Sequence, residues 1–420
     1  MVTVKTLEND IRVVTDRMDH VRSAAIGVWV NAGSVWETAA ESGISHFIEH
    51  MVFKGTARRS AEQIAAEMDA IGGNLNAFTS KECTCFYAKV LDEHLPIACD
   101  VLADLTLNAT FDPAEMQKEK GVVLEEIAMT EDTPEDLVME TAGTSFFDGT
   151  ALAPPILGER ETVSAMTPSM IRAYMDRRYT SGNIVIACAG HFDDEALYAL
   201  VREKFASVRT GAPSDKLAAQ YPGGRRVSFV EKDVEQVHIC MMLPGAPLGT
   251  KAQYTLSVLS NILGGGMSSR LFQNIREKRG LAYSIYSYPM SNVSTGALAL
   301  YAGTGAKQAD EVARLMLDEL RNVRENGVTQ EELTRCREQL LAGYVMSMEG
   351  SSSHMNAAGK VLLLQNREYN EAETLGRSEC VTIEDIQAAL PEYLNEAALC
   401  TAFVGRVNDK RAALTAAVGD

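Results

Sequence analysis

Two stretches in the first half of the chain recur in its second half at nearly the same spacing. Residues 111–126 align with residues 328–343 at an offset of 217, and residues 167–190 align with residues 382–405 at an offset of 215. Either alignment alone is weak, but separate windows that agree this closely indicate an internal repeat. We therefore predict an ancient duplication, so both halves of the chain should have the same fold.

The length of the chain and one segment near its middle predict where the two halves meet. A chain of 420 residues is long for a single core, so two domains of about 200 residues each are expected. Glycine, proline, serine and charged residues collect between residues 206 and 226, as they do in linkers. We predict a first domain over residues 1–210, a linker over 211–225 and a homologous second domain over 226–420.

Each half is predicted to mix strands and helices. Apolar runs such as residues 24–33 and 85–91 are typical of strands. Residues 60–73 predict a helix that opens on Ser60, with Gln63 three residues later, and closes on two glycines. The strands and helices are interspersed without a strict βαβα rhythm, which favours the α+β class.

The composition excludes several classes of protein. The net charge of −18 argues against a nucleic-acid partner, because binding phosphates needs a basic face, and it is compatible with basic peptides. No run of about 18 apolar residues lacks a charge, so we expect no membrane-spanning helix. Residues 1–20 lack the features of a secretory signal, which predicts a cytoplasmic location. Cys83 and Cys85 form only a lone C-x-C, which we interpret as structural.

Residues 43–56 gather His46, Glu49 and His50 within five positions of a chain with seven histidines. On a helix, side chains four residues apart stand about 40° apart on one face, and Glu49 lies about 60° to the other side of His46. Two imidazoles with a nearby carboxylate suit a divalent metal such as zinc. The alternative is a structural histidine pair, since this spacing also arises by chance in about one chain in a hundred. A catalytic zinc ion needs a third protein ligand, which must come from elsewhere.

The third ligand is predicted among the four glutamates between residues 115 and 126. On a helix whose apolar face centres on Val123, Glu119 and Glu126 fall within about 60° of that centre, whereas Glu125 points about 200° away. Carboxylates on the buried side of a helix are costly unless they bind a metal or are paired. We predict Glu126 as the third ligand and Glu119 as a group that orients a ligand.

The second half lacks the groups that would bind a metal. The positions equivalent to Glu119 and Glu126 hold Cys336 and Gly343. The triple glycine at residues 264–266 lacks the Gly-Lys-Ser/Thr ending of a phosphate-binding loop, so we predict a flexible turn there. Only the first half is therefore expected to hold a metal.

These motifs resemble the inverted-motif zinc peptidases of the pitrilysin, insulysin and mitochondrial processing peptidase group, whose signature is H-x-x-E-H. The resemblance covers essentially the whole chain, through HFIEHMVFKGT, GGNLNAFTSKECTCFYAKV, EKGVVLEEI, PPILGERETV and REKRGLAYSIYS. The length and two-domain build are most similar to the processing-peptidase branch and its bacterial relatives. The resemblance implies two homologous α+β domains that form one clam-shell half of such an enzyme.

The resemblance also implies roles for the residues of the first half. It places one Zn²⁺ per chain between His46, His50 and a glutamate 76 residues farther on, which is Glu126. Its supporting glutamate falls on Glu119. It makes Glu49 the general base that takes a proton from water and later passes it to the leaving amine.

Further roles that the resemblance implies concern the substrate. Arg276 and Tyr283, seven residues apart in the second half, would contact bound peptide and help stabilise the reacting carbonyl. The strand at residues 74–80 would pair with an extended peptide, with Asn74 and Ala77 as backbone contacts. Its alternating pattern fits ordinary sheet pairing equally well.

The sequence thus predicts a zinc endopeptidase that hydrolyses short or unfolded peptides inside a closed chamber. Relatives of this size enclose the site between two subunits, so the resemblance implies a homodimer or a heterodimer with an inactive paralogue. The alternatives are a noncatalytic assembly subunit and a peptide binder that needs a partner for turnover. The complete set of zinc ligands and general base favours the peptidase, although the same ligands also accept Mn²⁺ or Co²⁺.

Overall fold

A computed structural model describes residues 2–214 and 224–419 and shows two compact units. Much of the predicted linker, residues 215–223, lies outside the described residues. The first unit comprises residues 2–127, 154–214 and 346–370, and the second comprises residues 128–153, 224–345 and 371–419. The units therefore differ from the predicted domains 1–210 and 226–420 in two segments, because residues 128–153 and 346–370 each belong to the unit of the other half.

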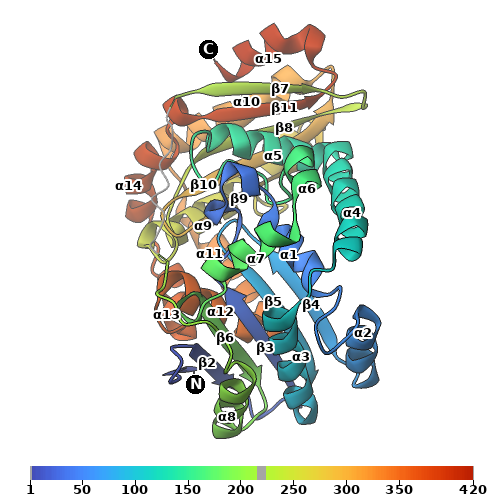
Figure 1. Ribbon diagram of the computed structural model, residues 1–420. Helices are drawn as coiled ribbons and strands as arrows, with labels where there is room; N and C mark the ends of the chain where they lie inside the picture. The colour runs from blue at the N-terminus through green and yellow to red at the C-terminus, as the bar shows by residue number, and fades with distance from the viewer. Residues whose placement is uncertain (1, 215–223, 420) are drawn as a thin grey trace. The chain divides into compact units, whose positions relative to one another are not determined.

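The first unit is built on a six-stranded sheet. Its strands are β1 (Val2–Thr6), β2 (Arg12–Arg17), β3 (Ser23–Val30), β4 (Asn74–Thr79), β5 (Thr84–Leu91) and β6 (Ile184–Gly190). Figure 1 shows β2, β6, β3, β5 and β4 side by side in this order, and β1 continues the sheet beyond β2. Only the β2–β6 pair is parallel among these strands. β4 forms one edge of the sheet, so one side of its backbone has no strand partner among the described residues.

The second unit repeats this topology in a five-stranded sheet. Its strands are β7 (Arg226–Glu231), β8 (Gln236–Gly245), β9 (Ala282–Ser291), β10 (Gly296–Gly305) and β11 (Cys400–Gly405). The order is β7-β11-β8-β10-β9, and the β7–β11 pair is the parallel one. Strand for strand, this order matches β2-β6-β3-β5-β4, so the two units have one fold.

Helices cover both sheets. Those of the first unit are α1 (Ile44–Val52), α2 (Ala61–Ala70), α3 (Leu95–Asn108), α6 (Arg160–Ala165), α7 (Pro168–Arg178), α8 (Asp194–Lys204) and α12 (Ser351–Gln365). Those of the second unit are α5 (Pro134–Phe146), α9 (Lys251–Gly264), α10 (Ala309–Asn326), α13 (Glu371–Glu379), α14 (Ile383–Tyr393) and α15 (Arg411–Val418). The chain passes from one unit to the other within α4 (Pro113–Asp132) and α11 (Gln330–Ser347). The mixture of helices and sheets confirms the predicted α+β class.

The aligned windows of the sequence fall on equivalent elements. α4 and α11 begin 217 residues apart, as the first alignment requires, and α7 and α14 begin 215 residues apart, as the second requires. Thr167 and Thr382 cap these last two helices with the same side-chain hydrogen bond. Gly190 and Gly405 end β6 and β11 with positive φ angles of 125° and 139°. The predicted duplication is confirmed in these details of local structure.

One equivalent pair of helices is exchanged between the halves. α5 belongs to the first half of the chain but packs on β7, β8 and β11, whereas α12 belongs to the second half but packs on β2, β3 and β6. The fit of α12 depends on Gly359, because a Cβ atom there would lie 2.3 Å from the Trp29 indole nitrogen. Each sheet is thus covered on one face by a helix from the other half of the chain.

Two predictions about the chain as a whole can be compared with the structure. Within residues 2–214 and 224–419, no helix has the length and apolar character needed to cross a membrane. The eight cysteines are free thiols, and all but Cys380 are buried. Burial raises the pKa of the Cys83 thiol to about 11, so this thiol is protonated near neutral pH.

A half-buried ion pair at the start of α11 is expected to make the second unit sensitive to acid. Arg270 binds both oxygens of Glu332, at 2.7 and 2.9 Å, and Glu332 also accepts the backbone N–H of Thr329. Burial raises the pKa of Glu332, but the pairing with Arg270 outweighs this effect and holds the pKa at about 2, below the ordinary 4.5. Because the folded-state pKa is the lower one, this stabilisation is present above pH 4.5 and is lost as the pH falls toward 2.

Glu332→Gln should therefore lower the free energy of unfolding by about 2–3 kcal/mol at pH 7. The difference from wild type should shrink by about 1 kcal/mol at pH 4. Urea unfolding followed by circular dichroism at both pH values measures it. A difference that does not change with pH would contradict the assignment of the pKa shift to Glu332.

Candidate metal centre

The helix α1 carries the histidine motif because its two faces differ in polarity. Its apolar side chains are buried, and the remaining face presents His46, Glu49 and His50. Glu37 fixes the start of the helix, because its carboxylate accepts the backbone N–H groups of Gly43 at 2.7 Å and Ser45 at 2.8 Å. These bonds satisfy donors that a helix start leaves unpaired, and they fix the end of α1 that carries His46.

The helix α4 presents its glutamates as the sequence predicts. Val123 is fully buried and Glu119 is only 4% exposed, whereas Glu125 is exposed. Glu126 is half-buried, with its side chain 35% exposed. The predicted separation of Glu125 from Glu119 and Glu126 is confirmed, and Glu126 reaches α1 from this helix.

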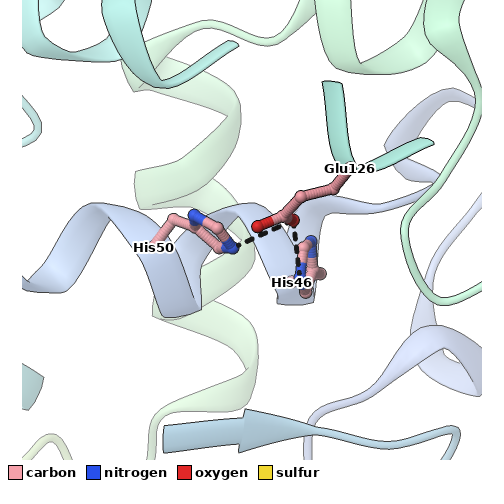
Figure 2. A group of neighbouring side chains, drawn as sticks. All are labelled: His46, His50 and Glu126. Carbon is pink, nitrogen blue, oxygen red and sulfur yellow. Dashed lines mark ion pairs between the residues drawn. The ribbon is translucent and has the colours of Figure 1, made fainter. Parts of the chain in front are cut away.

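His46, His50 and Glu126 converge on one point within the first unit (Figure 2). Glu126 Oε2 lies 3.6 Å from His46 Nε2 and 3.4 Å from His50 Nε2. Ligands that hold zinc tetrahedrally at about 2.0–2.1 Å stand about 3.3 Å from one another. The two distances from Glu126 are close to this spacing, so the two nitrogens and one oxygen would fit a zinc ion as three of its ligands.

Both imidazoles present their Nε2 atoms to Glu126. Burial, with a smaller contribution from the neighbouring His50, lowers the pKa of His46 to about 4, so its ring carries no charge near neutral pH. His50 Nδ1 lies 2.9 Å from Glu119 Oε1, and this contact assigns the proton to Nδ1 and leaves Nε2 as the metal-binding atom. Glu119 thus contacts the ring of His50, and its predicted orienting role stays a prediction.

Glu49 lies near His50 and Glu126 but is not part of the group that converges. Its Oε2 atom accepts a hydrogen bond from Thr79 Oγ1 at the end of β4. Burial raises the pKa of Glu49, and the charge of Glu126 adds to this, whereas the Thr79 hydrogen bond and His50 act in the opposite direction. A carboxylate with a raised pKa next to a metal site is suited to accept and return a proton.

The edge strand β4 distinguishes the two predicted substrate contacts. The Ser80 N–H donates to the Cys83 carbonyl at the turn that joins β4 to β5. In an antiparallel ladder, every second residue turns its backbone N–H and C=O toward the partner strand. This bond therefore determines which residues of β4 face β5 and which face away. The N–H of Ala77 donates to the Asn76 side chain and faces away from β5. By the same alternation, the backbone of Asn74 is turned toward β5. Ala77 therefore offers its backbone at the free edge, whereas Asn74 offers only its exposed side chain.

Arg276 and Tyr283 lie in the second unit and contact each other. Arg276 belongs to a π-helical segment, Phe272–Glu277, and its guanidinium lies 4.6 Å from the Phe272 ring and 4.9 Å from the Tyr283 ring. Tyr283 is 75% exposed, although a tyrosine in an apolar strand would ordinarily be expected in the core. Segments of π-helix are frequent at functional sites, and the contact between half-buried Arg276 and exposed Tyr283 is consistent with one.

The second unit has no counterpart of the metal cluster among the described residues. Cys336 is buried, with a pKa raised to about 11 by burial, and Gly343 is exposed on α11. The prediction of a flexible turn at Gly264–Gly266 is wrong for Gly264, which ends α9. A Cβ atom there would lie 2.4 Å from the Ser287 backbone nitrogen, so this glycine permits a close approach of α9 to β9.

Three residues that contribute to the site were not predicted from the sequence: Glu37, Lys54 and Thr79. Lys54 Nζ lies 2.6 Å from Glu119 Oε2. It follows His50 by four residues, so the spacing argument applied to His46 and His50 could have identified it. Thr79 reaches Glu49 from a strand 30 residues farther along the chain, whereas Glu37 bonds to the start of α1 from a few residues upstream, outside any helical spacing.

Two family models match the chain. The model described as insulinase, peptidase family M16, matches residues 12–160, and the model described as the peptidase M16 inactive domain matches residues 165–340. The first matched region contains His46, His50 and Glu126, and the second begins within the first half of the chain and extends into the second half.

Several curated relatives are similar over nearly the whole chain. One is the uncharacterized zinc protease YmxG of Bacillus subtilis, 40% identical, with 94% of this chain and 96% of the relative covered. Others are the uncharacterized zinc proteases SCO5738 of Streptomyces coelicolor, 38% identical with coverage of 97% and 90%, and Rv2782c of Mycobacterium tuberculosis, 41% identical with coverage of 93% and 90%.

Solved structures show the same fold. A peptidase M16 inactive domain from Pseudomonas fluorescens superimposes with a TM-score of 0.90 at 20% identity, covering 96% of this chain and 98% of that chain. A protease from Helicobacter pylori superimposes with a TM-score of 0.89 at 21% identity, covering 96% and 99%. At this level of identity, the similarity concerns the fold alone.

Proposed function

Because this chain belongs to peptidase family M16, the insulinase family, we propose that it is a zinc-dependent endopeptidase acting on short or unfolded peptides. The observation that carries the proposal is the convergence of His46, His50 and Glu126, with Glu49 beside them outside the ligand set. A protein with only a scaffolding role would have no need to keep three ligands, a buried orienting carboxylate and a base together.

The proposed cofactor is one Zn²⁺ per chain. His46 and His50 would supply Nε2 atoms and Glu126 a carboxylate oxygen, which is a donor set that zinc prefers. Zinc bound there would polarise the scissile carbonyl and lower the pKa of water. The same nitrogen and oxygen donors also accept Mn²⁺ or Co²⁺, so the choice of zinc rests on the similarity to zinc proteases as well as on the ligands.

The proposed role of Glu49 is to carry a proton. Its carboxylate would take the proton from the attacking water and then deliver it to the nitrogen of the leaving amine. The hydrogen bond from Thr79 orients one carboxylate oxygen and leaves the other available for this transfer. Glu119 would act indirectly, by holding the His50 ring in the orientation that metal binding needs.

The substrate would bind as an added strand along β4. Main-chain hydrogen bonds in this mode are independent of the peptide sequence. The N–H of Ala77 faces away from β5 and would donate to a peptide carbonyl in place of the Asn76 side chain, which accepts it in the free protein. Arg276 and Tyr283 are proposed to contact the bound peptide near the reacting carbonyl. The net charge of −18 is compatible with basic peptides.

Ala77→Pro should weaken peptide binding without disturbing the metal. Proline removes the outward N–H and is tolerated on edge strands, so we expect kcat/KM to fall about 2–10-fold, the value of one hydrogen bond. The zinc content should not change. Asn74→Ala is the matched control on the same strand, and a larger loss there than at Ala77 would contradict the proposed pairing.

The proposed assembly is a chamber closed by a second subunit, either a second copy of this chain or an inactive paralogue, and the proposed location is the cytoplasm. One assay tests the function: the purified chain is incubated with an unstructured basic peptide, products are identified by mass spectrometry, and bound metal is quantified. Cleavage by a zinc-loaded chain supports the peptidase. Zinc without cleavage would favour a partner-dependent subunit, and absence of metal would favour a scaffold.

A further inference from the structure

One lysine contacts the metal centre through an intermediate residue. Lys54 Nζ lies 2.6 Å from Glu119 Oε2, and the other oxygen of this carboxylate, Oε1, lies 2.9 Å from His50 Nδ1. His50 Nε2 in turn lies 3.4 Å from Glu126. These contacts connect a lysine that is no ligand to a proposed ligand of the metal.

The position of Lys54 suits this connection. It follows His50 by four residues, and its backbone N–H donates to the Met51 carbonyl in the turn that ends α1. The two side chains therefore leave the same end of α1 and hold the Glu119 carboxylate between them, one at each oxygen. A carboxylate held at both oxygens has a single orientation.

The charge of Lys54 serves the same arrangement. The Glu119 side chain is only 6% exposed, and a buried carboxylate is costly unless it is paired. The site also holds the carboxylates of Glu49 and Glu126. Without a positively charged partner, the Glu119 carboxylate would be more stable facing water than buried against His50.

We propose that Lys54 is a positioning residue: it holds Glu119 in the orientation that presents His50 Nε2 to the metal. The inference rests on the proposed function in taking His50 as a metal ligand. Lys54 would touch neither the metal nor the substrate, and its contribution would be expressed in metal affinity before any chemical step. Contacts that orient a metal ligand typically change metal affinity by about 10–100-fold.

The test measures zinc affinity by competition with a chromophoric chelator. Lys54→Met should weaken zinc binding about 10-fold or more, whereas Lys54→Arg, which keeps a cationic donor, should recover most of the wild-type affinity. Lys118→Met is the matched control, because Lys118 also forms a 2.6 Å ion pair, with Glu115, but on the exposed side of α4. Its zinc affinity should equal that of wild type.

A double-mutant cycle distinguishes positioning from a general loss of structure. Lys54→Met leaves Glu119 as an unpaired buried charge, so the substitution is also made in the Glu119→Gln background, where no charge is left uncompensated. If Lys54 acts through Glu119, it should have no further effect on zinc affinity there. An equal loss in both backgrounds would overturn the proposal, as would wild-type affinity in Lys54→Met.

The outcomes also separate this inference from the proposed function. A wild-type chain that binds zinc and cleaves peptide, with a Lys54→Met variant of unchanged affinity, would remove the role of Lys54 and leave the peptidase intact. A wild-type chain that binds no zinc would remove both.

Discussion

Glu49→Gln should reduce kcat for peptide hydrolysis by about 10²–10⁴-fold, the usual contribution of a general base, while zinc remains bound. Glutamine keeps the shape of the side chain and its contact with Thr79, but it cannot accept a proton from water. Glu49 is also absent from the group of three proposed ligands, so its substitution should not release the metal. Peptide cleavage and metal content, measured on the same samples, test both parts of the expectation.

Two other results for Glu49→Gln would count against the proposed role. Loss of zinc together with activity would show that Glu49 acts as a ligand or supports the ligands. Activity close to wild type would show that another group takes the proton. Circular dichroism of the variant provides the control for folding.

Glu126→Ala should abolish stoichiometric zinc binding, whereas Glu125→Ala should leave it unchanged. The two residues are neighbours on α4, yet Glu125 is exposed and Glu126 lies 3.4 Å from His50 and 3.6 Å from His46. Removing a ligand should exceed the 10–100-fold loss of affinity typical of an orienting partner. Metal analysis after gel filtration measures the result, and peptide cleavage should be lost in parallel.

The pair is informative because the substitutions are chemically identical. Each removes one carboxylate from the same helix and changes the net charge by the same amount. A loss of zinc in both variants would indicate a general effect of charge or helix stability. Retention of zinc in Glu126→Ala would require a different third ligand.

The grouping of His46, His50 and Glu126 could be predicted from the sequence because it depends on local geometry. Helical periodicity alone separates Glu126 from Glu125 and places His46 beside His50, and both arrangements are found. The duplication was also visible, since capping residues and end-of-strand glycines keep their spacing in both halves.

The remaining features depend on choices that local patterns do not encode. Amphipathicity shows that α5 and α12 each have a face to bury, but not which sheet receives it. The backbone direction of Asn74 depends on the phase of the ladder, which the turn at Ser80 and Cys83 fixes. The role of Gly264 depends on the distance between α9 and β9, which no pattern within either element reveals.

The exchange of α5 and α12 has a consequence for biosynthesis. During translation, the strands β2, β3 and β6 are complete by residue 190, but the helix that covers one of their faces ends at residue 365. The nascent first unit must therefore keep an apolar sheet face uncovered until nearly the whole chain has left the ribosome. Such a surface is prone to aggregation and is the kind that chaperones bind. A messenger RNA truncated before α12 would yield a polypeptide that carries every metal ligand and still could not complete the unit that holds them.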